Sequence, residues 1–393
     1  MGNEELFETT SEGWQPLSRI LGASHPFFDR TLYWEGYDNS SNVYVIAGDS
    51  LTIIDPGNDY VALADLFRRG FLPSDVRKIV LTHGHVEHVM GAVELFRYPA
   101  GSGTDALEVI FHESGPRGFR EMLEEAAKEF PRALTLTEIR GGETIDLGGF
   151  PVEVIHTPGH TMDSLCLYQS PTRSLFTGDT VLPYAVASPD PAAGGRAEYH
   201  LFVIKQLMTR RIDVLLPGHG RPVAAEARRV LEGSYAGVVK KMVGLETPWI
   251  EGAATLAQKG YLEESLFCCE KERELHPENR KALELKATCL NDLGRFPEAI
   301  EAFEQLQEEG ENPLFPLLGK GVALMGLGKY GESLSAFEKI LAEKPDFQEA
   351  LMYKGMALYL SGRYDEAMQV HPFEKEFMER FKATLEKKAR PSL

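Results

Sequence analysis

The chain has 393 residues, of which 43% are apolar and 25% charged, and its 59 acidic and 41 basic side chains give a formal net charge of −18. A chain of this length exceeds the size at which a single hydrophobic core usually stops growing, so we expect two domains. The acidic balance argues against a nucleic-acid partner, and no stretch approaches the roughly 20 apolar residues that span a bilayer.

The N-terminal residues MGNEELFETTSEGW lack a basic segment followed by an apolar run. We therefore expect no secretory signal and a cytoplasmic location. The cysteines show no CxxC spacing and are expected to be reduced and mostly buried. They are Cys166, Cys268, Cys269 and Cys289.

Short β-rich runs alternate with helical runs between residues 30 and 235. Strands are predicted at 42–47, 50–54, 78–81, 108–111, 152–155, 165–168, 174–176 and 213–216. Helices are predicted at about 60–70, 88–97, 116–130 and 197–210. Many strands with interspersed helices predict a layered α/β architecture with sheets at its centre.

After Pro248 the strand-like runs disappear and helical periodicity takes over. Four glycines, at 260, 294, 328 and 362, are each 34 residues apart, and they begin the similar segments GYLEES, GRFPEA, GKYGES and GRYDEA. This pattern resembles the tetratricopeptide repeat, over about 253–371. We predict an all-α repeat domain at 248–393, with residues 373–389 as its capping helix.

A cluster of metal-ligand residue types follows the strand KIVL. The segment THGHVEH places His83, His85, Glu87 and His88 on a loop that leads into a helix. Imidazole and carboxylate groups are the ligands that a hard or borderline divalent metal prefers, and a loop at a strand end lets several of them converge.

Three later strands end in the same manner. VEVI leads to His160, SLF to Asp179 and DVLL to His219, and each of these residues stands beside a glycine. The glycines let the backbone turn while the polar side chain projects from the edge of the sheet.

Taken in order, THGHVEH, TPGHT, TGDT and PGHG resemble the metallo-β-lactamase superfamily, as do the upstream segments NVYVI and IDPG. The resemblance covers residues 30–235 and implies an αββα sandwich with metals at one edge, between two sheets. We assign the catalytic domain to residues 1–247.

The resemblance also implies a ligand set for two divalent metal ions, for which zinc is expected and iron or manganese are alternatives. One ion would be held by His83, His85 and His160, the other by Glu87, His88 and His219, with Asp179 as a bridge. Asp55 would hold the ligand loops through hydrogen bonds. The superfamily usually has Asp at the position of Glu87, so occupancy of the second site, or a role for Glu87 as a base, stays open. Asp179 and Glu87 are the expected catalytic residues.

The chemistry expected of such a centre is attack of a metal-bound hydroxide on a thioester, lactone or other ester. The short loops around His160 and Asp179 resemble the glyoxalase II branch. β-Lactamases proper use Cys at the position of Asp179, so antibiotic hydrolysis is disfavoured.

Three further residues are candidates for contact with a small-molecule substrate: His112 after the strand EVIF, Tyr184 in the loop after Asp179, and Arg196, which could hold an anion. His156 and His200 are expected to pack in the interior.

Two rival interpretations remain. The resemblance extends to persulfide dioxygenases, which would need a single iron on His83, His160 and Asp179. Alternatively, the repeats are the functional part and the metal domain is a non-catalytic scaffold. In each case the repeats are expected to bind a protein partner or a second copy of the chain.

Overall fold

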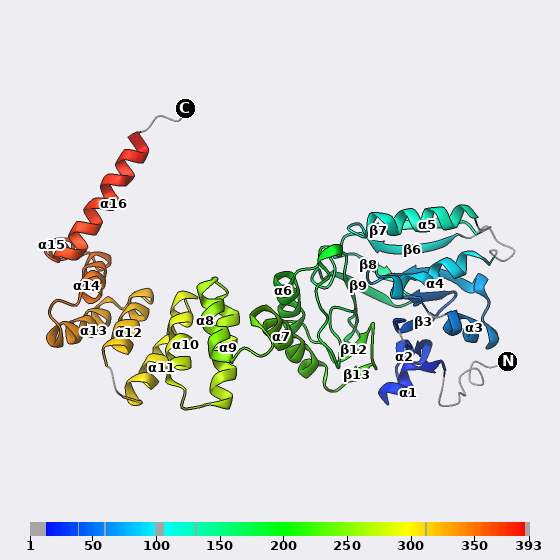
Figure 1. The fold of residues 1–393 in the computed structure, drawn as a ribbon, viewed down its shortest axis with the longest axis horizontal. Helices are drawn as coiled ribbons and strands as arrows, with labels where there is room; N and C mark the ends of the chain where they lie inside the picture. The colour runs from blue at the N-terminus through cyan, green and yellow to red at the C-terminus, as the bar shows by residue number, and fades with distance from the viewer. Residues whose placement is uncertain are drawn as a thin grey trace. The chain divides into compact units, whose positions relative to one another are not determined.

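The computed structural model of the chain describes residues 13–37, 39–58, 60–98, 106–129, 132–310 and 313–389. The chain divides into two compact units, Met1–Met242 and Val243–Leu393. The first contains the sheets and the second is helical (Figure 1).

The first unit is built on two mixed sheets. The described strands of one sheet follow chain order: β1 (Gln15–Pro16), β2 (Thr31–Trp34), β3 (Val43–Ala47), β4 (Leu51–Ile54), β5 (Val76–Val80), β6 (Leu107–His112) and β7 (Leu134–Ile139). Those of the other run in the order β13 (Val223–Ala224), β12 (Val214–Pro217), β11 (Ser174–Gly178), β10 (Leu165–Gln169), β9 (Pro151–His156) and β8 (Thr144–Asp146).

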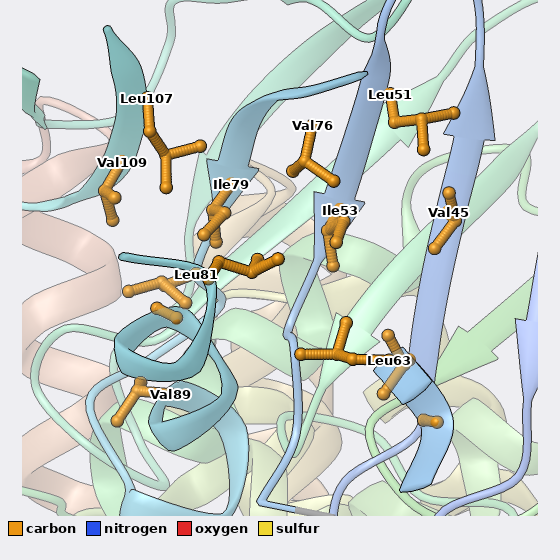
Figure 2. Close-up of a cluster of buried hydrophobic side chains, with 14 of the residues drawn as sticks. Val45, Leu51, Ile53, Leu63, Val76, Ile79, Leu81, Val89, Leu107 and Val109 are labelled. Carbon is orange, nitrogen blue, oxygen red and sulfur yellow. The ribbon is translucent and has the colours of Figure 1, made fainter. Parts of the chain in front are cut away.

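Both faces of the first sheet are buried, which explains why its central strands are apolar without alternation. Tyr44 and Ile46 of β3 point into a core that also contains side chains of the second sheet, such as Val154 and Phe176. The alternate residue Val45 points the opposite way, into a core shared with helices. Figure 2 shows this outer core.

Helices cover the outer faces of the sheets. α3 (Tyr60–Arg68), α4 (Val86–Phe96) and α5 (Arg117–Glu129) contribute apolar side chains to the core of the first sheet. Figure 1 shows α6 (Ala197–Met208) and α7 (Ala227–Val243) beside the second sheet. Two short helices, α1 (Leu17–Leu21) and α2 (Pro26–Arg30), precede β2.

The second unit is a series of antiparallel helices. They are α8 (Trp249–Gln258), α9 (Leu262–Leu275), α10 (Arg280–Asp292), α11 (Phe296–Glu308), α12 (Leu314–Gly326), α13 (Tyr330–Glu343), α14 (Gln348–Leu360), α15 (Tyr364–Met368) and α16 (His371–Ala389). Consecutive helices pack on one another, and α16 also packs on α14.

The four glycines with the 34-residue spacing lie in the turns that end α8, α10, α12 and α14. Each has a positive φ, between 73° and 85°, in the left-handed region that favours glycine. After each of them the next N–H donates to a carbonyl five residues back, as Arg295 does to Leu290. The backbone of the turn therefore explains the spacing seen in the sequence.

The predicted fold class is confirmed: a two-sheet α/β sandwich is followed by a helical repeat array. Strands β1, β2, β7, β8 and β13 and helices α1, α2 and α7 were not predicted from the sequence. No helix over the described residues is long and apolar enough to cross a membrane.

Candidate metal centre

The polar residues at the strand ends meet at one edge of the sandwich. β9, β11 and β12 run in the same direction, so His160, Asp179 and His219, which follow them, lie at the same end of the second sheet. β5 of the first sheet leads to His83, and His85 is the N-cap of α4. Both sheets therefore contribute to one cluster.

The first ligand group consists of three imidazoles. Nδ1 of His85 lies 3.1 Å from Nε2 of His83 and 3.1 Å from Nε2 of His160. Together these three residues form a group that could hold a metal ion.

Asp179 connects this group to a second one. Its Oδ2 lies 3.8 Å from Nε2 of His160 and 3.6 Å from Nε2 of His219, and its Oδ1 lies 3.4 Å from Nε2 of His88. His83, His88 and Asp179 form one possible ligand group, and Glu87, His88 and His219 form another. Glu87, whose side chain is one methylene longer than that of Asp, thus lies with the second group.

Hydrogen bonds outside the cluster fix which nitrogen of each ring faces inward. The buried Asp55 accepts the N–H and the hydroxyl of Thr82, at 2.8 and 2.6 Å, and lies 2.8 Å from Nδ1 of His88. The Thr82 oxygen in turn lies 3.1 Å from Nδ1 of His83. These contacts leave Nε2 of His83 and Nε2 of His88 directed at the cluster.

Two more histidines are held from the loop after β11. Nδ1 of His160 donates to the carbonyl of Ser188 at 2.7 Å. Nε2 of His85 lies 3.0 Å from Oδ2 of Asp190. His85 therefore presents Nδ1 to the cluster, whereas His160 presents Nε2.

Charge and burial set the protonation of these groups. Burial lowers the pKa of His83 well below its ordinary value, and burial also lowers that of His160, so both imidazoles are neutral at pH 7. Burial alone would raise the pKa of Asp179, but the neighbouring His88 outweighs it and the pKa lies well below the usual range. Burial would lower the pKa of His88, but Asp55 and Asp179 outweigh it and raise the pKa to about 10. The carboxylates of Asp55 and Asp179 thus favour a positive charge at His88, which lies between them.

Two parts of the chain match family profiles. Residues 36–219 match the Metallo-beta-lactamase superfamily, and residues 270–312 and 318–370 match the Tetratricopeptide repeat. A protein of Mycobacterium leprae is 32% identical over 209 residues, which cover 48% of this chain and 90% of the relative. The chain belongs to the metallo-beta-lactamase superfamily. Tetratricopeptide repeats follow this domain.

Other similar proteins have functional names. A protein of Methanocaldococcus jannaschii, described as a probable metallo-hydrolase, is 31% identical over 195 residues, covering 47% of this chain and 90% of the relative. An atrochrysone carboxyl ACP thioesterase of Paecilomyces divaricatus is 26% identical over 183 residues, covering 46% and 50%. A solved metallo-beta-lactamase family protein of Thermus thermophilus has a TM-score of 0.41 and 21% identity, covering 62% of this chain and 92% of that chain.

The cluster fits the metal ions that the superfamily implies. Nε2 of His88 and Oδ1 of Asp179 are buried and have no hydrogen-bond partner among the described residues. Buried polar atoms are almost always paired, so two such ligand-type atoms, 3.4 Å apart and without a hydrogen-bond partner, fit the coordination of a cation. Nitrogen and carboxylate donors in this arrangement suit zinc or iron.

The structure brings together all seven expected ligands and places Asp55 against His88. The three substrate candidates lie in different settings. His112 is buried, stacks on His156 with ring centroids 4.0 Å apart, and uses both ring nitrogens in contacts with the backbone. Tyr184 is exposed and packs at Gly220, next to His219.

The third candidate, Arg196, is the exposed N-cap of α6, and its guanidinium lies over the ring of Tyr199, 5.8 Å from the centroid. His156 and His200 hydrogen-bond to backbone carbonyls, those of Met162 and Thr180. The sequence singled out none of the three residues Thr82, Ser188 and Asp190. Asp190 lies in the segment SPDPAAGGR, and its position before a proline was the only sequence feature that indicated a structural role.

Proposed function

We propose that the chain is a metal-dependent hydrolase that cleaves a thioester, a lactone or another ester. The observation that supports this most strongly is the convergence of the ligand groups around Asp179 at one edge of the sandwich. The names of two relatives, a probable metallo-hydrolase and a thioesterase, point to the same class of reaction.

Two ions, zinc first and otherwise iron or manganese, would be held by the two ligand groups. The first group is His83, His85 and His160; the second is Glu87, His88 and His219; Asp179 lies beside both. When bound, such ions supply a water nucleophile at neutral pH and polarise the carbonyl of the substrate.

The protein's own groups prepare this chemistry. Burial keeps the imidazoles of His83 and His160 neutral, so they present lone pairs, and Asp179 remains a carboxylate because the neighbouring His88 holds its pKa low. Asp55 and the carbonyl of Ser188 keep the rings in place. The site is therefore ordered before substrate arrives, which lowers the reorganisation needed during the reaction.

A cavity of about 340 Å³ opens beside the second group. Its lining consists of Asn39, Asn58, Val86, Glu87 and His219. The two amides offer both donors and acceptors, and therefore suit an uncharged polar acyl group. We assign the acyl part of the substrate to this cavity.

The repeat unit is proposed to bind a protein partner or a second copy of the chain. A hollow between α14 and α16 supports this, because its walls include apolar side chains, among them Met352, Tyr353 and Phe373. Sedimentation velocity of the full chain distinguishes the two cases: a concentration-dependent dimer indicates self-association, and a monomer at all concentrations indicates a different partner.

The hydrolase proposal is tested by incubating the metal-loaded chain with acyl thioesters, lactones and aryl esters, and by following thiol, acid or phenol release. We expect turnover with at least one class, and a loss of about 100-fold in Asp179→Asn. The control Asp213→Asn removes a surface partner of Arg173 and should keep full activity. No turnover by the metal-loaded wild type, or full activity in Asp179→Asn, would contradict the proposal.

A further inference from the structure

A carboxylate in the loop after β11 contacts one of the expected ligands from outside the cluster. Oδ2 of Asp190 lies 3.0 Å from Nε2 of His85, although the two residues are 105 positions apart in the chain. Asp190 itself was not among the residues expected to take part in metal binding.

The local backbone holds Asp190 firmly. Its Oδ1 accepts the N–H of Ala192 at 2.9 Å, which caps a short 3₁₀ turn at Pro191–Ala193. Its own N–H donates to the carbonyl of His160 at 2.7 Å, and its carbonyl accepts the N–H of Gly195 at 2.7 Å. One oxygen is thus used locally, and the other is left in a fixed position for His85.

This contact determines the tautomer of His85. A carboxylate only accepts hydrogen bonds, so the proton of the neutral imidazole must be on Nε2. The lone pair is then on Nδ1, the atom that lies 3.1 Å from Nε2 of both His83 and His160. The other carboxylate near the ring, that of Glu87, lies 3.8 Å from Nδ1 and would favour the opposite tautomer. Asp190 is the closer of the two carboxylates and therefore determines the tautomer of His85.

His85 differs in this respect from two other ligands of the cluster. His88 and His160 face the cluster with Nε2 and are held through Nδ1 by Asp55 and by the carbonyl of Ser188. His85 faces it with Nδ1 and is held through Nε2. The ring nitrogen that binds a metal is set by the hydrogen bond that the other nitrogen makes, so the reversed orientation of His85 needs an acceptor of its own.

We propose that Asp190 is a positioning residue for the first metal-binding group, because it fixes the tautomer and the orientation of His85. This inference rests on the metal site of the proposed function. Asp190 acts through His85 and does not touch the reacting atoms. Outer carboxylate partners of this kind commonly change metal affinity by about 10–100-fold.

The decisive variant is Asp190→Ser, because serine is as good an N-cap as aspartate but is too short to reach His85 as well. It keeps the 3₁₀ turn and removes the acceptor at Nε2. Asp190→Asn is a second variant: its single oxygen can accept from Ala192 or from His85, but not from both. The control is Asp65→Ser, which removes a similarly exposed carboxylate from an ion pair with Arg69.

The first readout is zinc affinity of the full chain, measured by competition with a chromophoric chelator. We expect one of the bound zinc ions to be held about 10–100-fold more weakly in Asp190→Ser than in wild type or Asp65→Ser. The second readout is the ¹H–¹⁵N NMR spectrum of the zinc-loaded, ¹⁵N-histidine-labelled chain. Wild type should show one histidine ligated through Nδ1 and protonated on Nε2, and Asp190→Ser should lose or shift this signal, an effect that a role in loop stability alone would not produce.

Equal zinc affinity and an unchanged Nδ1-ligated signal in Asp190→Ser would overturn the inference and leave the metal site intact. If the wild type itself binds no zinc, iron or manganese, both the inference and the proposed hydrolase fail. The two failures are therefore distinguishable by the behaviour of the wild type.

Discussion

Removal of the Asp55 side chain should destabilise the first unit strongly. Asp55 is buried and accepts from the N–H and the hydroxyl of Thr82, and it pairs with His88 at 2.8 Å. In Asp55→Ala three polar groups lose their acceptor in the interior. Breaking a buried pair in this way costs about 3–5 kcal/mol, which is a large part of the stability of a typical domain.

The backbone provides a matched comparison. Asp55 has a φ of 47°, in the left-handed region that asparagine tolerates as well as aspartate does. Asp55→Asn also keeps one oxygen as an acceptor, so its cost should be only about 1–2 kcal/mol. Asp213→Ala, which removes a surface partner of Arg173, should cost at most about 0.5 kcal/mol.

The assay is urea unfolding of the full chain in the presence of a chelator, so that ion binding does not add to stability. The chain has three tryptophans. In a Trp249→Phe background the fluorescence reports the first unit alone, because Trp14 and Trp34 lie there with ring centroids 5.5 Å apart. A loss of less than about 1 kcal/mol in the free energy of unfolding of Asp55→Ala would show instead that other groups or water can replace the buried acceptors.

Three further outcomes follow from the structure. Burial lowers the pKa of His200 from its ordinary 6.5 to about 4, so the neutral ring contributes stability that is fully present above pH 6.5 and is lost as the pH falls. Other buried histidines, His83 and His160, act in the same direction in both proteins, so the free energy of unfolding in urea should fall by about 2 kcal/mol more in wild type than in His200→Gln between about pH 7.5 and pH 5. A Cβ at Gly218 would lie 2.5 Å from Oδ1 of Asp179, so Gly218→Ala should lower the free energy of unfolding by about 1–3 kcal/mol in the same assay. Gly233 lies on α7 with open space around it, so Gly233→Ala should raise the free energy of unfolding by up to about 1 kcal/mol. Phe303 is buried in the repeat unit, so Phe303→Ala should lower the free energy of unfolding by about 3–5 kcal/mol, measured by far-UV circular dichroism during urea unfolding.

Each of these expectations has a contrary result. Parallel pH profiles for wild type and His200→Gln would show that this ring does not carry the acid sensitivity. A Gly218→Ala protein as stable as Gly233→Ala would show that the turn after β12 can move away from Asp179. An unchanged transition in Phe303→Ala would mean that the repeat core is packed differently from the structure.

Sequence patterns predicted the central strands because these are buried on both faces and therefore consist of unbroken apolar runs. β7, with the sequence LTLTEI, alternates apolar and polar residues and was missed, and β1 and β13 are two residues long and exist only through their pairing partners. α7 was missed for a different reason. It contains Gly237, where a Cβ would lie 2.1 Å from the side chain of Val186. Close packing therefore requires glycine at this position, although glycine has a low helix propensity.

The ligands themselves were predictable because each follows a strand in a short glycine-containing motif. Their outer partners were not, since a hydrogen bond such as that between Asp190 and His85 joins distant segments and has no local periodicity. The same holds for His112, which follows a strand as the ligands do but has its ring nitrogens in contact with the backbone. A position after a strand end therefore identifies candidate metal ligands, and only the tertiary contacts distinguish the ligands from residues such as His112.

The most direct test of a two-ion hydrolase is the metal content of the purified, reconstituted chain, measured by elemental analysis for wild type and for Glu87→Asp. The structure places Glu87 with His88 and His219, so we expect two equivalents of zinc, iron or manganese per chain in both proteins. A single iron per chain would contradict the two-ion hydrolase and favour the mononuclear oxidoreductase. No bound metal after reconstitution would contradict metal-dependent catalysis altogether.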